Sequence, residues 1–185
     1  MIERLALPDV LLATSTVHRD ARGAFAETYR ASALVAAGVA APAVVQENLV
    51  RTARAGVLRG LHFQLPPFAQ AKLVQVVAGA LFDVAVDIRP ASPTLGRWVG
   101  VTLSAETPRQ LFVPAGFAHG YLTLTDDCSV LYKTSAYYAP EAERGLCWND
   151  PALAIDWPME SVAANARDES WPSFAEAIVE LDRRG

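Results

Sequence analysis

Strict alternation of apolar and polar residues is the feature that most limits how this chain can fold. In residues 82–89 the apolar side chains Phe82, Val84, Val86 and Ile88 occupy every second position, which is the period of a β-strand. Gly79 and Pro114 are among the turn-forming residues between such segments. Further strands are predicted at 11–17, 44–50, 57–64, 72–77, 98–103, 110–113, 119–124 and 129–134. Many short strands at this spacing predict an all-β sandwich or barrel, with a jelly roll as the leading form.

Helical periodicity is confined to two short segments. One covers residues 32–37 and ends at Gly38, and the other covers residues 173–182, so both are expected at the periphery of the β core. A length of 185 residues suits one domain, and no repeat or low-complexity linker interrupts the sequence. We therefore expect a single domain over residues 1–185, in which the segment from about residue 160 wraps the β core.

Composition excludes several classes of protein. Hydrophobic residues make up 52% of the chain, which rules out a largely disordered protein, and the net charge of -4 argues against nucleic-acid or anionic-membrane partners. Residues 1–9 lack the long apolar core that a signal peptide needs, so none is expected there. The apolar run at 35–45 is too short and too interrupted by proline to be expected to span a bilayer. Two cysteines without Cys-x-x-Cys spacing indicate reduced thiols. We expect a cytoplasmic protein.

A histidine interrupts the apolar pattern of the predicted strand at 57–64. His62 is either a satisfied core residue or a catalytic base, and only His18 and His119 accompany it in the chain, so a base that works without metal is the simpler hypothesis. In an ideal strand Arg59 and His62 would point to opposite faces because their separation is odd. A bulge at Gly60 would bring both side chains to one face.

Several motifs occur together and in order at 20–27, 59–64, 72–74, 114–120, 132–133 and 137–138. In these segments the chain resembles the dTDP-4-dehydrorhamnose 3,5-epimerases, and the resemblance runs from about residue 2 to the C-terminal helix. It implies a cupin-type jelly roll (a double-stranded β-helix), a homodimer, and no metal or organic cofactor. It also implies epimerisation at carbons 3 and 5 of dTDP-4-keto-6-deoxyglucose, through an enolate, to give dTDP-4-keto-L-rhamnose.

The resemblance assigns the catalytic roles. His62 would be the base, and Tyr132 would be the acid on the opposite face of the sugar. Lys72 would stabilise the enolate oxygen. Asp168 would orient His62, in a segment that keeps the family's Lys-Asp spacing to a later proline but has arginine in place of the lysine. Asp150 is the alternative orienter.

The other candidates would hold the substrate. Arg59 has the planar guanidinium suited to a pyrophosphate, and Gln46 and Asn48 would add neutral hydrogen bonds. The family's Arg-Gly-x-Phe-x-Glu segment reaches into the neighbouring subunit, with Phe25 stacking on the base and Glu27 accepting from it or bracing Arg22. The full set of substrate-binding candidates is Arg22, Phe25, Glu27, Gln46, Asn48, Arg59, His119, Tyr138 and Arg167.

Departures from the family pattern keep alternatives open. Leu49, Val50 and Phe68 stand where the family usually has histidine, serine and histidine. This difference fits a repacked rim, a changed sugar or nucleotide preference, or an enzyme that acts at carbon 3 or carbon 5 alone. A metal-binding cupin is a further alternative, although residues 62–64 lack the His-x-His pair typical of metal cupins. A sugar-binding module without turnover is another. On residue type alone, Lys72 and Asp168 would be surface charges, Tyr132 a strand aromatic, and Phe25 a core residue.

Overall fold

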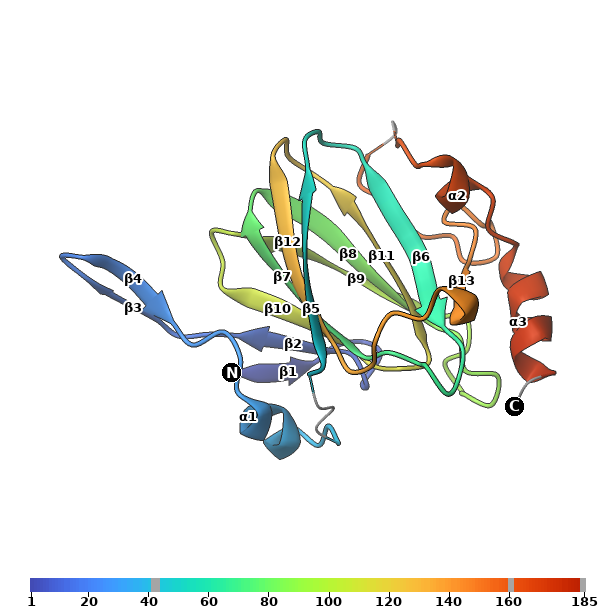
Figure 1. Ribbon diagram of the computed structural model, residues 1–185, viewed down its shortest axis with the longest axis horizontal. Coiled ribbons are helices and arrows are strands. Elements are labelled where there is room, and N and C mark those ends of the chain that lie inside the picture. The colour runs from blue at the N-terminus through green and yellow to red at the C-terminus, as the bar shows by residue number, and fades with distance from the viewer. Residues whose placement is uncertain (41–43, 160–161, 184–185) are drawn as a thin grey trace.

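The computed structural model describes residues 1–40, 44–159 and 162–183. Two antiparallel sheets face each other and form the β core (Figure 1). The six-stranded sheet has the order β1 (Ile2–Arg4), β2 (Leu11–Thr14), β10 (Arg109–Val113), β7 (Lys72–Ala78), β12 (Cys128–Thr134) and β5 (Gln46–Thr52). The five-stranded sheet has the order β13 (Glu143–Gly145), β6 (Leu58–Gln64), β11 (Phe117–Thr123), β8 (Ala80–Asp87) and β9 (Trp98–Ser104). The expected all-β, cupin-type jelly roll is confirmed.

A strand is present at each predicted position, and its bounds differ from the predicted ones by at most three residues. The largest difference is at 11–17, where β2 ends at Thr14 because the chain then leaves the sheet and forms the hairpin of β3 (Val17–Asp20) and β4 (Gly23–Ala26). Strands β1, β3, β4 and β13 were not predicted, because they are too short for alternation to be visible.

Both predicted helices are confirmed. The first is α1 (Ala31–Ala36), and the second is α3 (Phe174–Asp182), which begins with a capping box between Ser173 and Glu176. Two further helical turns, the 3₁₀ turn η1 (Pro140–Ala142) and α2 (Ala166–Glu169), were not predicted, since three or four residues carry no helical period.

Strand β8 is buried on both faces. Val84 and Val86 pack with Ala177 of α3 in a cluster on the outer side of the five-stranded sheet. Ala85 packs with residues of both sheets in the cluster between them. The aspartates that share this inner face, Asp83 and Asp87, are fully buried. The alternation in the sequence therefore marks two buried environments rather than a core face and a solvent face.

The C-terminal segment covers the outer side of the five-stranded sheet. Figure 1 shows α2 and α3 beside β6 and β13, and Phe174, Ile178 and Leu181 of α3 pack against the outer cluster. The indole N–H of Trp98 in β9 donates to the Leu153 carbonyl at 3.0 Å, which ties the segment to the sheet. This packing places the short helix α2 next to β6.

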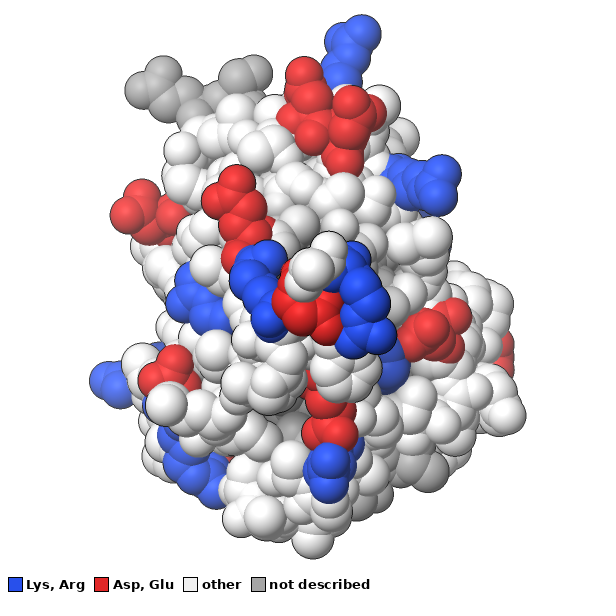
Figure 2. Space-filling model, turned by 90° about the vertical axis from the view of Figure 1, so that its left-hand side faces the viewer, with Lys and Arg blue, Asp and Glu red and all other residues white. Residues whose placement is uncertain are grey.

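The hairpin β3–β4 projects away from the two sheets (Figure 1). Figure 2 faces this side of the molecule and shows charged groups of both signs separated by wide uncharged areas. The hairpin turn places Gly23 at a φ of 132°, a conformation that glycine adopts without steric cost. Within the described residues no helix is long and apolar enough to cross a membrane.

Candidate active site

A cavity of about 410 Å³ opens between the two sheets. Its walls combine polar side chains from β5, β6, β7, β11 and β12 with three residues next to and within α2. The lining residues are Gln46, Asn48, Val50, Arg59, His62, Phe63, Gln64, Gln70, Lys72, Val74, His119, Tyr121, Tyr132, Thr134, Tyr138, Glu143, Asn165, Arg167 and Asp168. Ten of the thirteen residues proposed from the sequence are in this set.

The bulge expected at Gly60 is present. His62 pairs with His119 and Arg59 pairs with Tyr121, so three steps along β6 match two steps along β11. Gly60 has a φ of 128°, and a Cβ there would come within 2.5 Å of the Gly120 Cα. Glycine is required both by the backbone conformation and by the close approach of the two strands. As a result Arg59 and His62 both line the cavity.

His62 forms a close pair with Asp168. Its Nε2 lies 2.5 Å from Oδ1 of the aspartate, and the two side chains are 27% and 2% exposed. Burial acts to raise the pKa of the Asp168 carboxyl, but the hydrogen bond and charge of His62 outweigh it, and the pKa lies below its usual value. Asn165 caps α2 and accepts from the Asp168 backbone N–H at 2.8 Å, which fixes the helix turn that carries the carboxylate.

Tyr132 and Lys72 belong to the sheet opposite His62. Both come from the six-stranded sheet, whereas His62 comes from the five-stranded one. Burial raises the pKa of Tyr132, against the nearby charge of Arg59. Burial lowers the pKa of Lys72 to about 8, although the charges of Asp83 and Glu143 act in the opposite direction. The Lys72 Nζ reaches across to the His62 carbonyl at 3.4 Å.

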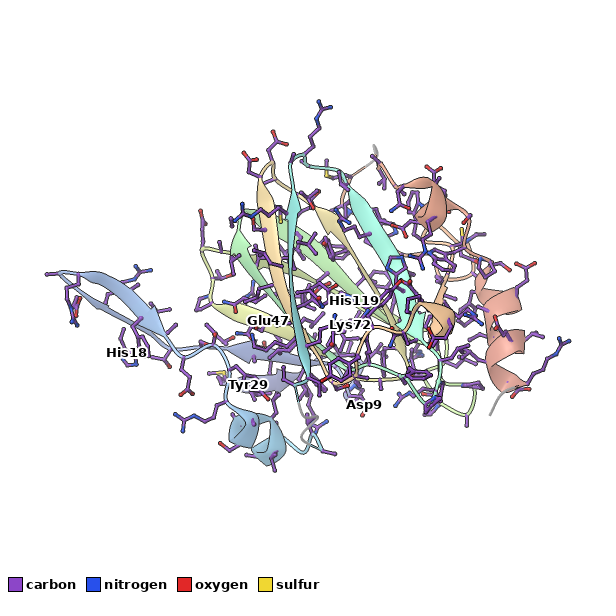
Figure 3. All side chains as sticks on the ribbon, in the orientation of Figure 1. Asp9, His18, Tyr29, Glu47, Lys72 and His119 are labelled. Atoms are coloured by element: carbon purple, nitrogen blue, oxygen red, sulfur yellow. The ribbon has the colours of Figure 1, made fainter. Side chains whose placement is uncertain are left out.

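A second histidine–aspartate pair includes His119, which lines the same cavity, and Asp83, which is fully buried. His119 Nε2 is 2.6 Å from Oδ1 of Asp83, and both side chains are buried. Burial lowers the pKa of His119, and the charge and hydrogen bond of Asp83 oppose the change. Figure 3 shows His119 and Lys72 within the β core. Asp83 was missed as a site residue, although its position opposite the apolar face of 82–89 could have indicated it.

The mouth of the cavity holds a cluster centred on Glu143 of β13. The Tyr138 hydroxyl donates to its Oε2 at 2.6 Å, and the Arg167 guanidinium binds the same oxygen. The bond to Glu143 is the main cause that raises the pKa of Tyr138. Gln46 joins this region because its Oε1 accepts from the Tyr138 backbone N–H at 3.0 Å. Glu143 carried no signal in the sequence, since it lies in a strand of three residues.

The cavity wall carries a pair of neutral amides and a guanidinium, which suit an uncharged and an anionic part of a ligand. Gln46 Nε2 donates to Asn48 Oδ1 at 2.9 Å, and both amides face the cavity from β5. The Nε of Arg59 is buried and has no hydrogen-bond partner within the described part of the chain. A guanidinium with an unused donor is a suitable partner for a phosphate oxygen.

Three proposed substrate residues lie outside the cavity, on or beside the projecting hairpin. Arg22 pairs with Asp20 at 2.6 Å, and the side chain of Phe25 is 69% exposed. The idea that Glu27 braces Arg22 is wrong for this chain alone, because Glu27 pairs with Arg30 at 2.6 Å. The alternative that Phe25 is a core residue is also wrong. Arg22, Phe25 and Glu27 are thus absent from the described lining of this cavity.

The structure also shows where Asp150, the alternative orienter, and the residues that depart from the family pattern lie. Asp150 accepts from the backbone N–H groups of Ala152 and Phe174 at 2.8 and 2.6 Å, so it fixes the start of α3 and does not orient His62. Leu49 and Phe68 are exposed, whereas Val50 lines the cavity. Across the described ranges, no group of three or more His, Cys, Asp or Glu side chains is arranged to hold a metal ion.

Comparison with known proteins places this arrangement in a family. A family model described as dTDP-4-dehydrorhamnose 3,5-epimerase matches residues 4–176. The enzyme of that name from Pseudomonas aeruginosa is 49% identical, over 94% of this chain and 96% of its own length. A crystal structure of a dTDP-6-deoxy-D-glucose-3,5-epimerase from Legionella pneumophila, in complex with dTDP-4-keto-L-rhamnose, superposes with a TM-score of 0.92 at 41% identity, covering 98% and 96% of the two chains.

A relative with a narrower reaction is similar too. The structure of a 3'-monoepimerase from Streptomyces bikiniensis in complex with dTDP-quinovose has a TM-score of 0.88 at 35% identity, covering 96% of this chain and 90% of that chain. The match of the family model over nearly the whole chain, and the near-complete coverage of relatives, are decisive. The chain belongs to the dTDP-4-dehydrorhamnose 3,5-epimerase family.

Proposed function

We propose that this protein converts dTDP-4-keto-6-deoxyglucose to dTDP-4-keto-L-rhamnose by epimerisation at carbons 3 and 5. One observation carries the proposal. A histidine paired with a buried carboxylate faces a tyrosine and a lysine from the opposite sheet across one cavity. Inversion at a carbon beside a ketone needs a base on one side and an acid on the other, with a group that stabilises the enolate.

The chemistry follows from the positions of these groups. Asp168 accepts a hydrogen bond from His62 Nε2, which leaves Nδ1 to take the proton from the carbon next to the ketone. The electron pair of the broken C–H bond moves into the carbonyl and forms an enolate. Lys72 places its charge next to the developing oxyanion, and Tyr132 returns a proton to the opposite face. Because burial raises the pKa of Tyr132, the hydroxyl keeps its proton until this step.

Substrate binding would divide between two subunits. In this proposal Arg59 binds the pyrophosphate, while Gln46, Asn48, His119, Tyr138 and Arg167 line the rest of the substrate site. The protein would form a homodimer in which Arg22, Phe25 and Glu27 of each hairpin contact the nucleotide of the neighbouring subunit. The projection of the hairpin and the exposure of Phe25 support this arrangement.

Two broader proposals complete this picture. Residues 1–185 would form one cupin-type domain, which the packing of α3 on the five-stranded sheet supports. The protein would act in the cytoplasm without a metal or organic cofactor. The free thiols of Cys128 and Cys147 support a reducing compartment.

Inversion at a single carbon is the second candidate. The similarity to a 3'-monoepimerase favours it, as does Val50, an apolar residue that lines the cavity where the family usually has serine. A change in the wall can alter how the sugar sits and which C–H bond meets the base. The family model and the curated relatives favour both carbons.

Solvent exchange distinguishes these reactions. The purified protein is incubated with dTDP-4-keto-6-deoxyglucose in deuterated water, and proton NMR follows the sugar signals. Deuterium at carbons 3 and 5 with formation of dTDP-4-keto-L-rhamnose is the expected result, and label at one carbon alone would identify a monoepimerase. His62→Ala is expected to abolish exchange but retain affinity for dTDP. Absence of exchange by the unmodified protein would reject the proposal, and activity that requires a bound metal would favour the metal-cupin alternative.

A further inference from the structure

The indole of Trp171 contacts the imidazole of His62. The ring centroids are 5.9 Å apart and the planes cross at 73°, which is an edge-to-face arrangement. Trp171 follows α2 and is not among the described residues that line the cavity. Trp171 therefore touches a residue of the cavity wall without itself belonging to the described lining.

A glycine makes room for this contact. Gly145 of β13 is the cross-strand partner of His62, and a Cβ at Gly145 would come within 2.4–2.5 Å of three indole atoms of Trp171. Cross-strand neighbours normally support each other through their side chains. Here the neighbour on the β13 side has no side chain, and the indole occupies that space. The indole therefore packs beside the imidazole in the space that a side chain at position 145 would take.

The same short segment holds His62 by a second contact. Asp168 lies three residues before Trp171 and forms the 2.5 Å pair with the histidine. The indole Nε1 and the second carboxylate oxygen of Asp168 are both buried, and neither has a hydrogen-bond partner in normal geometry among the described residues. The indole N–H donor and the Asp168 carboxylate oxygen thus lie on the same turn of chain beside His62. The indole N–H also acts to lower the pKa of the Asp168 carboxyl.

The indole is itself held in place from the direction of the cavity mouth. The guanidinium of Arg167 lies 5.3 Å from the centre of a Trp171 ring and binds Glu143 of β13. A cation over an aromatic face is a favourable contact. Arg167, where the family usually has lysine, therefore links α2, the indole and the strand next to His62.

We propose that Trp171 is a positioning residue for the base: the indole fills the space beside Gly145 and holds the imidazole in the orientation in which Asp168 accepts its N–H. This inference rests on the proposed function, because it takes His62 as the base. In this proposal Asp168 supplies the negative charge next to the imidazole of His62, and Trp171 fixes the orientation of that ring. Loss of the indole would slow proton transfer and leave nucleotide binding unchanged.

Graded substitutions test the proposal by kinetics. Trp171→Leu is expected to lower kcat about tenfold, which is near the upper end of what one aromatic pair contributes, with KM unchanged. Trp171→Phe keeps an aromatic edge and is expected to restore most of kcat. Trp148→Leu is the matched control, because Trp148 makes a similar edge-to-face contact with Trp157 and lies outside the cavity lining. It is expected to lower the melting temperature only.

A readout that does not depend on turnover accompanies the kinetics. The chain has three histidines, so NMR of the ring C–H groups resolves His62, whose signals sense the indole ring current. We expect those signals to move in Trp171→Leu and to stay near their wild-type positions in Trp148→Leu. If Trp171→Leu does not fold, Gly145→Ala displaces the indole from the other side and is expected to give the same loss of kcat.

The outcomes separate this inference from the proposed function. Wild-type kcat in a folded Trp171→Leu variant, or a loss that appears in KM alone, would overturn the positioning role while wild-type exchange still supports the epimerase. Absence of exchange in the wild type would overturn the proposed function. If, in addition, the ring signals of His62 stay at their wild-type positions in Trp171→Leu, the inferred contact between the two rings is overturned as well.

Discussion

Asp168→Asn isolates what a buried carboxylate contributes to the proposed base. The substitution keeps the shape of the side chain, which is 2% exposed, and removes the charge that lies 2.5 Å from His62 Nε2. During proton abstraction the imidazole becomes positive, and the carboxylate stabilises this form more than the neutral one. An amide cannot do so, and it can also favour the wrong tautomer by donating to the ring nitrogen.

The size of the effect can be bracketed. A hydrogen bond to a charged group contributes about 1.5–3 kcal/mol net, which corresponds to roughly 10- to 150-fold in rate. The full attraction between unit charges 2.5 Å apart is about 7 kcal/mol at an effective dielectric constant of about 20, before desolvation is subtracted. We therefore expect kcat to fall by about 10- to 10⁴-fold, a range that extends from the hydrogen-bond estimate to the effect of the same change in a catalytic triad.

The assay compares two buried aspartates. Initial rates of product formation and of deuterium incorporation are measured for Asp168→Asn and for Asp150→Asn, whose carboxylate holds backbone N–H groups at the start of α3. Asp150→Asn is expected to reduce the free energy of unfolding by about 1 kcal/mol and to leave kcat within about twofold of wild type. A folded Asp168→Asn variant with kcat within threefold of wild type would refute the assigned role.

Three further outcomes follow from the structure. Lys72 has a pKa lowered to about 8; the charged form exists below that pH, so kcat/KM is expected to decline above about pH 8, and Lys72→Gln should give a low activity without this decline. Tyr132→Phe removes the acid but not the base, so product formation should fall by about 10²-fold or more while NMR still detects deuterium entering the substrate. Gly60→Ala places a Cβ within 2.5 Å of Gly120, whereas Gly23 has a similar φ with nothing within 4 Å. Gly60→Ala is therefore expected to lower the melting temperature clearly more than Gly23→Ala, in which backbone strain of about 1–3 kcal/mol acts alone; equal effects in thermal unfolding would contradict the close packing of β6 on β11.

Local patterns in the sequence were sufficient for the longer strands and for the family. Alternation with period two is a property of consecutive residues, so β5 to β12 could be predicted without knowing their partners. The motif around His62 and the segment 167–172 supplied the proposed base and its orienter, and the two lie in contact although they are 106 residues apart. The glycine in the motif was also sufficient to predict the bulge.

Tertiary structure decided which buried charges meet. Asp83 lies in a strand whose alternation is clear, yet only the pairing of β8 with β11 shows that it binds His119. Glu143 and Trp171 belong to short segments without a period, and their contacts with the site depend on how β13 and α2 pack on β6.

The sequence alone thus determined the longer strands, the bulge and the chemical groups of the proposed reaction, because backbone period, glycine conformation and side-chain type are local properties. Only the packing of two sheets decided that β8 is buried on both faces, that Val50 faces the cavity and that Leu49 faces outward. It also decided that Gly145 leaves a space filled by an indole. These features arise from contacts between distant segments, whose energies no local pattern records.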